Sequence, residues 1–225
     1  VPYFYNLSEN KDFTFTPTFQ STATNYLTSE FRLLNKNGIF NIETNINDND
    51  DGEGTRHYIF ADGTLESKID KFDIYIQSSN NDTYMKKNQI NEIDVLTSGV
   101  TISDTIKGND FLFETKSYKH LSVSGSNQWE YLYPKLTYNV SNINFPYIKA
   151  NINVKNELLR LKSLDKNTKT SISSEINIDN QKIDRVRGFV YNNFFDNRFI
   201  YHSIKSENSR SDISQIRIFP QIGTS

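Results

Sequence analysis

The alternation in Asp12-Phe13-Thr14-Phe15-Thr16-Pro17-Thr18-Phe19-Gln20 decides the fold class of this chain. Successive side chains of a β-strand point to opposite faces of a sheet. One face of this segment is therefore aromatic, and the other face carries hydroxyl and amide groups. The aromatic run Tyr3-Phe4-Tyr5 and the turn-forming residues 7–11 precede it, which predicts a first strand and a tight connection.

The same period of two recurs along the chain, in residues 26–34, 40–46, 72–77, 148–155 and 172–179. Helical periodicity is nearly absent, and the best helix candidate, near residues 154–164, is better explained as a strand. Counted in this way, the chain has about 12–13 strands without helical crossovers. Such a sheet is antiparallel and follows the order of the sequence.

Several strand ends are predicted from turn chemistry. Asp62-Gly63-Thr64 and Asp179-Asn180-Gln181-Lys182 are expected to be turns. Residues 184–206 fit either one long strand or a hairpin about Asp196-Asn197. A long polar loop is expected over residues 78–92.

The connections alternate between short and long. Outer-membrane barrels alternate in this way, with short periplasmic turns and long external loops. If the short connections are periplasmic, the strand at Tyr3 runs towards the periplasm. We therefore expect at least one strand before it, and we expect the chain to be an interior piece of a longer protein. The short connections are 35–38, 63–66, 104–108 and 180–182, and the long ones are 47–54, 78–92, 121–127 and 161–169.

Composition favours a sheet with one lipid-facing side. Only 36% of the 225 residues are hydrophobic, against a typical ~45–50% in soluble domains, while 13% are aromatic. The predicted fold is an all-β, antiparallel up-and-down transmembrane β-barrel, of which residues 1–225 form an incomplete fragment. The alternative is a soluble sheet whose polar side is simply solvated, as in a β-sandwich.

Composition also argues against several function classes. A formal net charge of −2 gives no indication of nucleic-acid binding, and the absence of cysteine removes disulfides and thiolate chemistry. His57, His120 and His202 lie too far apart in sequence to suggest a zinc site. The acidic residues 47–53 do not fit the EF-hand pattern. We therefore expect no metal, no cofactor and no catalytic residues.

Two prolines lie within segments that otherwise have strand character, Pro2 and Pro17. Proline cannot donate a ladder hydrogen bond, so it occupies edges, bulges or weakened positions of a sheet. These two residues are the candidate functional positions of the sequence. The alternative is that they are edge or bulge prolines without a function.

The first residues resemble a known family. The run Pro2-Tyr3-Phe4-Tyr5-Asn6-Leu7-Ser8, followed by Asn10, Asp12 and Thr14-Phe15-Thr16-Pro17, is similar to the start of the barrel domain of LptD proteins, which assemble lipopolysaccharide in the outer membrane. Weaker similarities follow in the same order, at Glu30-Phe31-Arg32-Leu33-Leu34, Asn49-Asp50-Asp51 with Arg56-His57, Ser79-Asn80-Asn81-Asp82-Thr83-Tyr84 and Arg217-Ile218-Phe219-Pro220-Gln221.

This resemblance implies a function without bond making or breaking. Family members release lipopolysaccharide into the outer leaflet through a lateral opening at the seam of a barrel of roughly 26 strands. It implies as partners lipopolysaccharide, an LptE-like plug lipoprotein and periplasmic bridge proteins, with the Gram-negative outer membrane as the location. Pro2 and Pro17 match the prolines that weaken the family's seam. The family's disulfides would lie outside residues 1–225 or be absent.

Three other readings remain at this point. A porin-like channel would share the alternation of side chains, but is not expected to carry the two-proline motif. A secreted β-sandwich that binds a partner would be soluble without detergent. An outer-membrane lipase would need a nucleophile constellation, and none is recognisable in the sequence.

Overall fold

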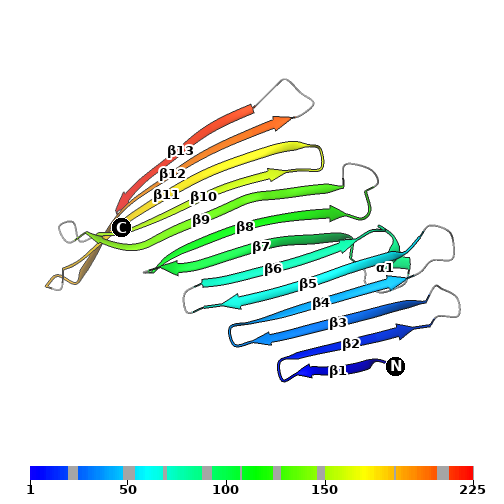
Figure 1. Ribbon diagram of the computed structural model, residues 1–225. Coiled ribbons are helices and arrows are strands. Elements are labelled where there is room, and N and C mark those ends of the chain that lie inside the picture. Colours follow the sequence, from blue (N-terminus) through cyan, green and yellow to red (C-terminus); the bar gives the residue numbers. More distant parts are fainter. Residues whose placement is uncertain are drawn as a thin grey trace. The chain divides into compact units, whose positions relative to one another are not determined.

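The fold is described from a computed structural model, which covers residues 1–19, 25–47, 54–67, 70–87, 93–106, 108–123, 128–145, 150–184, 186–206 and 213–224. These residues are almost entirely β-structure (Figure 1). The strands are β1 (Tyr3–Ser8), β2 (Lys11–Thr18), β3 (Tyr26–Asn35), β4 (Gly38–Asn47), β5 (Arg56–Glu66), β6 (Asp70–Ser79), β7 (Val95–Ile106), β8 (Asn109–His120), β9 (Trp129–Phe145), β10 (Ala150–Lys162), β11 (Asn167–Asp184), β12 (Phe189–Ser206) and β13 (Ile213–Thr224), and the one short helix among them is α1 (Tyr84–Lys87).

The 13 strands form one sheet in which each strand pairs with its neighbour in the sequence. This confirms the prediction of an all-β, antiparallel up-and-down arrangement of about 12–13 strands. The strand order begins at β1 and ends at β13, and the pairings among the described residues do not join these two strands into a closed barrel. No helix in the described part of the chain is long and apolar enough to cross a membrane.

The chain divides into two compact units. Unit 1 contains residues 1–102 and 116–131, and unit 2 contains residues 103–115 and 132–225. The strands of unit 1 up to β6 have 6–11 residues, whereas β10–β13 of unit 2 have 12–18 residues. Each unit has its own separation of polar and apolar side chains.

In unit 1, the register places apolar side chains opposite one another. Phe13 of β2 pairs with Phe31 of β3, which pairs with Ile42 of β4, and the row continues through Ala61 and Ile76. Because the side chains of one such row all point to the same side, this row defines the apolar face of unit 1. The alternation read from the sequence therefore becomes a continuous surface across β2–β6.

The adjacent row defines the polar face of unit 1. Asp12 pairs with Arg32, then Asn41, then Asp62, then Tyr75, across the same five strands. A shift of one residue in any strand would bring its polar side chains to the apolar face. The register is thus fixed by the same alternation that predicts the strands.

Unit 2 repeats this separation in longer strands. Ile172 of β11 lies opposite Leu158 on β10 and Tyr201 on β12. Lys155 and Arg198 lie opposite Glu175 of β11. Glu175 is three residues from Ile172 on the same strand, so its side chain points to the other face. The cross-strand order of a cation, a carboxylate and a cation favours this register.

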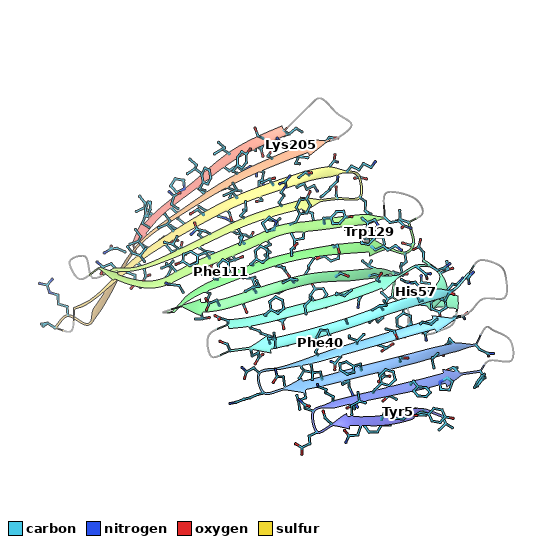
Figure 2. All side chains as sticks on the ribbon, viewed as in Figure 1. Tyr5, Phe40, His57, Phe111, Trp129 and Lys205 are labelled. Atoms are coloured by element: carbon cyan, nitrogen blue, oxygen red, sulfur yellow. The ribbon has the colours of Figure 1, made fainter. Side chains whose placement is uncertain are left out.

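The predicted turn at Asp62-Gly63-Thr64 is wrong, because β5 continues through it to Glu66. Gly63 lies on the apolar face opposite Phe40, and a Cβ atom at Gly63 would come within 2.5 Å of the Phe40 ring. The glycine is needed here for cross-strand packing, which a turn signal cannot distinguish from a turn. Figure 2 shows Phe40 on the strand beside β5.

The predicted turn at residues 179–182 is also wrong. Strand β11 runs on to Asp184, which pairs with Phe189 of β12, and the chain turns at residues 186–188. Gly188 has a φ of 72°, which favours glycine. Residues 189–206 form one strand, so the hairpin about Asp196-Asn197 does not exist. The acidic loop expected at 47–53 lies mostly outside the described residues.

Candidate functional site

The two candidate prolines lie at the same end of the β1–β2 pair. Pro2 comes directly before β1, and Pro17 lies in β2 opposite Leu27 of β3. The last pair between β1 and β2 at this end joins Tyr3 to Phe15, so both prolines lie just beyond it. The register therefore places both Pro2 and Pro17 at the end of the β1–β2 pair where the pairing of β1 stops.

Strand β1 is a weakly held edge of the strand order. It has six residues, all of them exposed, and its register with β2 is irregular between Asn6 and Ser8. Ring stacking contributes to its contact with β2, since Phe15 lies 5.1 Å from Tyr3 and 5.8 Å from Tyr5 between ring centroids. A short, bulged strand has few ladder hydrogen bonds to lose when it separates.

The apolar face of unit 1 is open to its surroundings. Large side chains on it remain exposed, including Leu27 at 40%, Ile46 at 49% and Ile76 at 43%. Contiguous exposed apolar surface of this kind marks a binding or membrane-facing region in a native protein. The side chains spread over β3–β6, so the exposure belongs to the face and not to a single residue.

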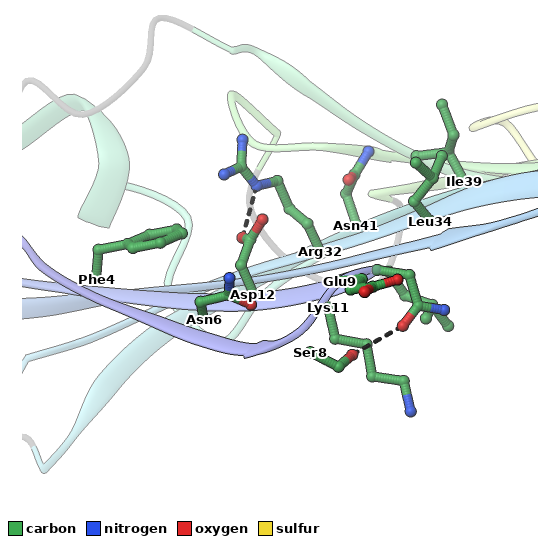
Figure 3. A pocket seen from close by; sticks show the side chains of 12 residues that line it. Phe4, Asn6, Ser8, Glu9, Lys11, Asp12, Arg32, Leu34, Ile39 and Asn41 are labelled. Atoms are coloured by element: carbon green, nitrogen blue, oxygen red, sulfur yellow. Dashed lines mark hydrogen bonds and ion pairs between the residues drawn. The ribbon is translucent and has the colours of Figure 1, made fainter.

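The polar face of unit 1 carries direct contacts between neighbouring strands. Arg32 Nε donates to Asp12 Oδ1 at 2.8 Å, and Asn41 Nδ2 donates to Asp62 Oδ2 at 2.9 Å. Figure 3 shows the first contact at a hollow of about 350 Å³, which Phe4 also lines. Charged and amide groups in such a row fit a surface that contacts water or a polar ligand.

The buried core of unit 1 lies on this polar face. Tyr58, Tyr84, Met85 and Leu96 have 0–1% exposure, and Leu121 is also buried. Tyr58 belongs to the polar rows because it pairs with Asn45. A protein that buries its core on the polar side of a sheet has inverted the usual arrangement, in which the apolar side is covered.

Helix α1 reaches this core from the connection between β6 and β7 (Figure 1). The Tyr84 hydroxyl donates to Asn45 Oδ1, and Asn45 Nδ2 donates to Thr28 Oγ1 at 2.8 Å. Tyr58 donates in the same way to Glu43. Burial, together with the charge of Tyr26, raises the pKa of Tyr84 to about 12, so its hydroxyl remains a donor at neutral pH.

Asp82 ties the start of this segment to β8 and to the residue before β9. Its carboxylate accepts from Lys119 Nζ and from Gln128 Nε2, each at 2.7 Å. Burial alone would raise the pKa of Asp82, but the hydrogen bonds from Lys119 and Gln128 outweigh it and hold the pKa below its usual range. Asp82 is thus charged while these contacts are made.

The sequence did not predict α1, which falls in the loop expected over residues 78–92. The helix has four residues, too few for a periodic signal, and is held by side chains far away in sequence. The one available signal was Tyr84-Met85, an apolar pair inside a polar stretch, with the only methionine of the chain.

Trp129 and Tyr131 form a second aromatic feature at the start of β9. Their rings stack 6.1 Å apart with 9° between planes, and both side chains are exposed. Figure 2 labels Trp129. Exposed tryptophan and tyrosine near strand ends are typical of the aromatic belts at membrane surfaces.

Potential metal ligands do not gather at one place in the described part of the chain. No group of three or more histidine, cysteine, aspartate or glutamate side chains lies close enough to hold a metal ion there. His120 faces Glu130 at 3.1 Å, and His57 and His202 belong to β5 and β12.

Comparison with protein-family models finds no match for this chain, and comparison with curated proteins finds none.

Proposed function

We propose that this chain forms part of a β-barrel of the Gram-negative outer membrane that delivers lipopolysaccharide to the outer leaflet, as LptD proteins do. The observation that carries this proposal is the inverted sheet of unit 1. Its core and hydrogen bonds lie on the polar face, while the apolar face remains exposed across β3–β6. Lipid is the surrounding in which such an apolar face is stable, and an internal water-filled space suits the polar face.

Strand length supports the membrane part of the proposal. Strands β3–β6 have 10 or 11 residues, and a tilted membrane-spanning strand needs about 9–11 residues. The exposed pair Trp129 and Tyr131 adds an aromatic group of the kind found at the membrane surface.

The weak edge at β1 supports the transport part. Lipopolysaccharide that leaves a barrel sideways must pass between two strands that separate. The short β1, its irregular register and the position of Pro2 and Pro17 beyond its last pair all lower the cost of separating it. The polar face would receive the sugar portion and the plug lipoprotein, and periplasmic bridge proteins would supply the substrate. The process needs no catalytic residue.

Thiol labelling tests the membrane part, because the chain has no cysteine of its own. Ile76→Cys on the apolar face and Glu30→Cys on the polar face are both at exposed positions. In outer-membrane vesicles we expect a water-soluble maleimide to label Glu30→Cys and a lipid-soluble maleimide to label Ile76→Cys. Equal labelling of both by the water-soluble reagent would contradict the proposal.

Restoring the missing ladder donors tests the transport part. Each proline of the pair Pro2→Ala and Pro17→Ala should regain roughly one net hydrogen bond, about 0.5–1.5 kcal/mol, and slow seam opening about 2- to 13-fold. Pro220→Ala in β13, opposite Asn197, is the matched control. Lipopolysaccharide arrival at the cell surface is measured after a pulse of labelling. Unchanged arrival in the double variant would favour a porin-like channel or a purely structural role.

A further inference from the structure

Residues 80–87 are fixed to the polar face of unit 1 at their start and in their middle. Asn80 exchanges hydrogen bonds with the backbone of His57 at 2.8 and 3.2 Å. Asp82 binds Lys119 and Gln128, and Tyr84 reaches Asn45 in β4. A surface connection needs none of these contacts, so this segment has a defined seat.

The seat is formed by apolar side chains of β5, β7 and the end of β8. Tyr84 and Met85 insert between Tyr58 of β5, Leu96 of β7 and Leu121, which follows β8. The polar rows of β4 and β5 continue beyond this seat. The segment therefore covers one end of the polar face with two apolar side chains, Tyr84 and Met85.

The contacts that hold this segment are of different kinds. Asp82 and Lys119 retain 34% and 15% of their side-chain exposure, so water reaches the ion pair and can replace it. Asn80, in contrast, is bound through backbone groups of β5. Release of the segment therefore requires the Asp82 contacts to break and the buried Tyr84 and Met85 to leave their seat, while the Asn80 contacts and the strand pairing are kept.

We infer that residues 80–87 are a latch that closes the water-filled path along the polar face, and that the Asp82–Lys119–Gln128 contacts are its release point. This inference rests on the proposed function, since a path exists only if the polar face lines the inside of a barrel. The closed state is the one described here, with Tyr84 and Met85 seated. Release removes both side chains from the path and opens it to polar solutes.

A cysteine pair can open and close this latch in one protein. Asp82→Cys with Lys119→Cys removes the ion pair, and a short bifunctional thiol cross-linker then restores the connection. In planar bilayers we expect the reduced double variant to conduct more than the parent protein, and cross-linking to return the conductance to the parent level. Asn41→Cys with Asp62→Cys, a directly paired couple on the same face away from the latch, is the control and should not respond.

The outcomes separate the two proposals. Conductance that is unchanged by a cross-link confirmed by mass spectrometry overturns the latch and leaves the barrel intact. Channels that respond equally to the control pair also overturn it. Equal labelling of Ile76→Cys and Glu30→Cys by the water-soluble maleimide in outer-membrane vesicles overturns the proposed function, and with it the path that the latch would close. Trypsin cleavage after Lys86 provides a second readout, expected to rise in the reduced double variant and to fall on cross-linking.

Discussion

The two faces of the sheet in unit 1 use the same strands in opposite ways. The polar face holds the buried core, the Tyr84–Asn45 and Tyr58–Glu43 hydrogen bonds and the seat of α1. The apolar face has stacked rings and aliphatic rows but stays exposed. A soluble sheet covers its apolar face first, because that burial drives folding. The membrane location proposed above would supply the missing cover of the apolar face.

The largest expected effect is on the polar face, at Tyr84. Truncation of a buried aromatic side chain costs about 3–5 kcal/mol, because it removes contacts and leaves a cavity. We expect Tyr84→Ala to lower the free energy of unfolding by this amount, measured by urea unfolding in lipid bilayers. Tyr84→Phe keeps the ring and should cost only about 1–3 kcal/mol, because the buried Asn45 Oδ1 loses its donor. Equal losses of unfolding free energy in both variants would show that packing of the Tyr84 ring does not stabilise the core.

The next effect distinguishes the faces directly. Ile42→Lys places a charge in the middle of the apolar row, and a lysine facing lipid at mid-membrane costs about 2–4 kcal/mol. Thr14→Lys on the polar face, opposite Glu30, should be close to neutral. Unfolding from bilayers compares the two variants. A similar small cost for both would mean that the apolar face does not contact lipid.

A smaller effect is expected at the closest cross-strand packing of the apolar face. Gly63→Ala brings a methyl group within 2.5 Å of Phe40 and 3.3 Å of Ile74. Overpacking of this kind costs about 1–3 kcal/mol. The second substitution Phe40→Leu should recover part of the loss, which a double-mutant cycle measures. Without such recovery, the penalty would have to come from the backbone.

The smallest effect is the pH dependence at Asp82. Its pKa is lowered in the folded protein, so its contribution to stability is complete above the unfolded value of ~3.9 and is lost as the pH falls through the folded value. We expect the difference in unfolding free energy between the parent and Asp82→Asn to shrink across this acidic range. A difference that stays constant down to the folded pKa would contradict the Lys119 and Gln128 contacts.

The sequence predicted what depends on periodicity and missed what depends on distant contacts. The rows through Phe31 and Arg32 follow directly from alternation, and the strand at 154–162 was preferred correctly over a helix. Gly63 and residues 179–182 were read as turns because their residue types favour turns, although cross-strand neighbours keep them extended. The meeting of Pro2 and Pro17 beyond the last β1–β2 pair required the register, which no single segment contains.

The seat of α1 has a consequence for the order in which the chain assembles. Each strand pairs with the strand made just before it, so every hairpin can form from local contacts as it emerges. Tyr84 must instead find Asn45 across 39 residues, and Gln128 must find Asp82 across 46. Closing such loops is slower than closing a hairpin. We therefore expect residues 80–87 to dock last, as the event that reports that β4 through β8 are all in place.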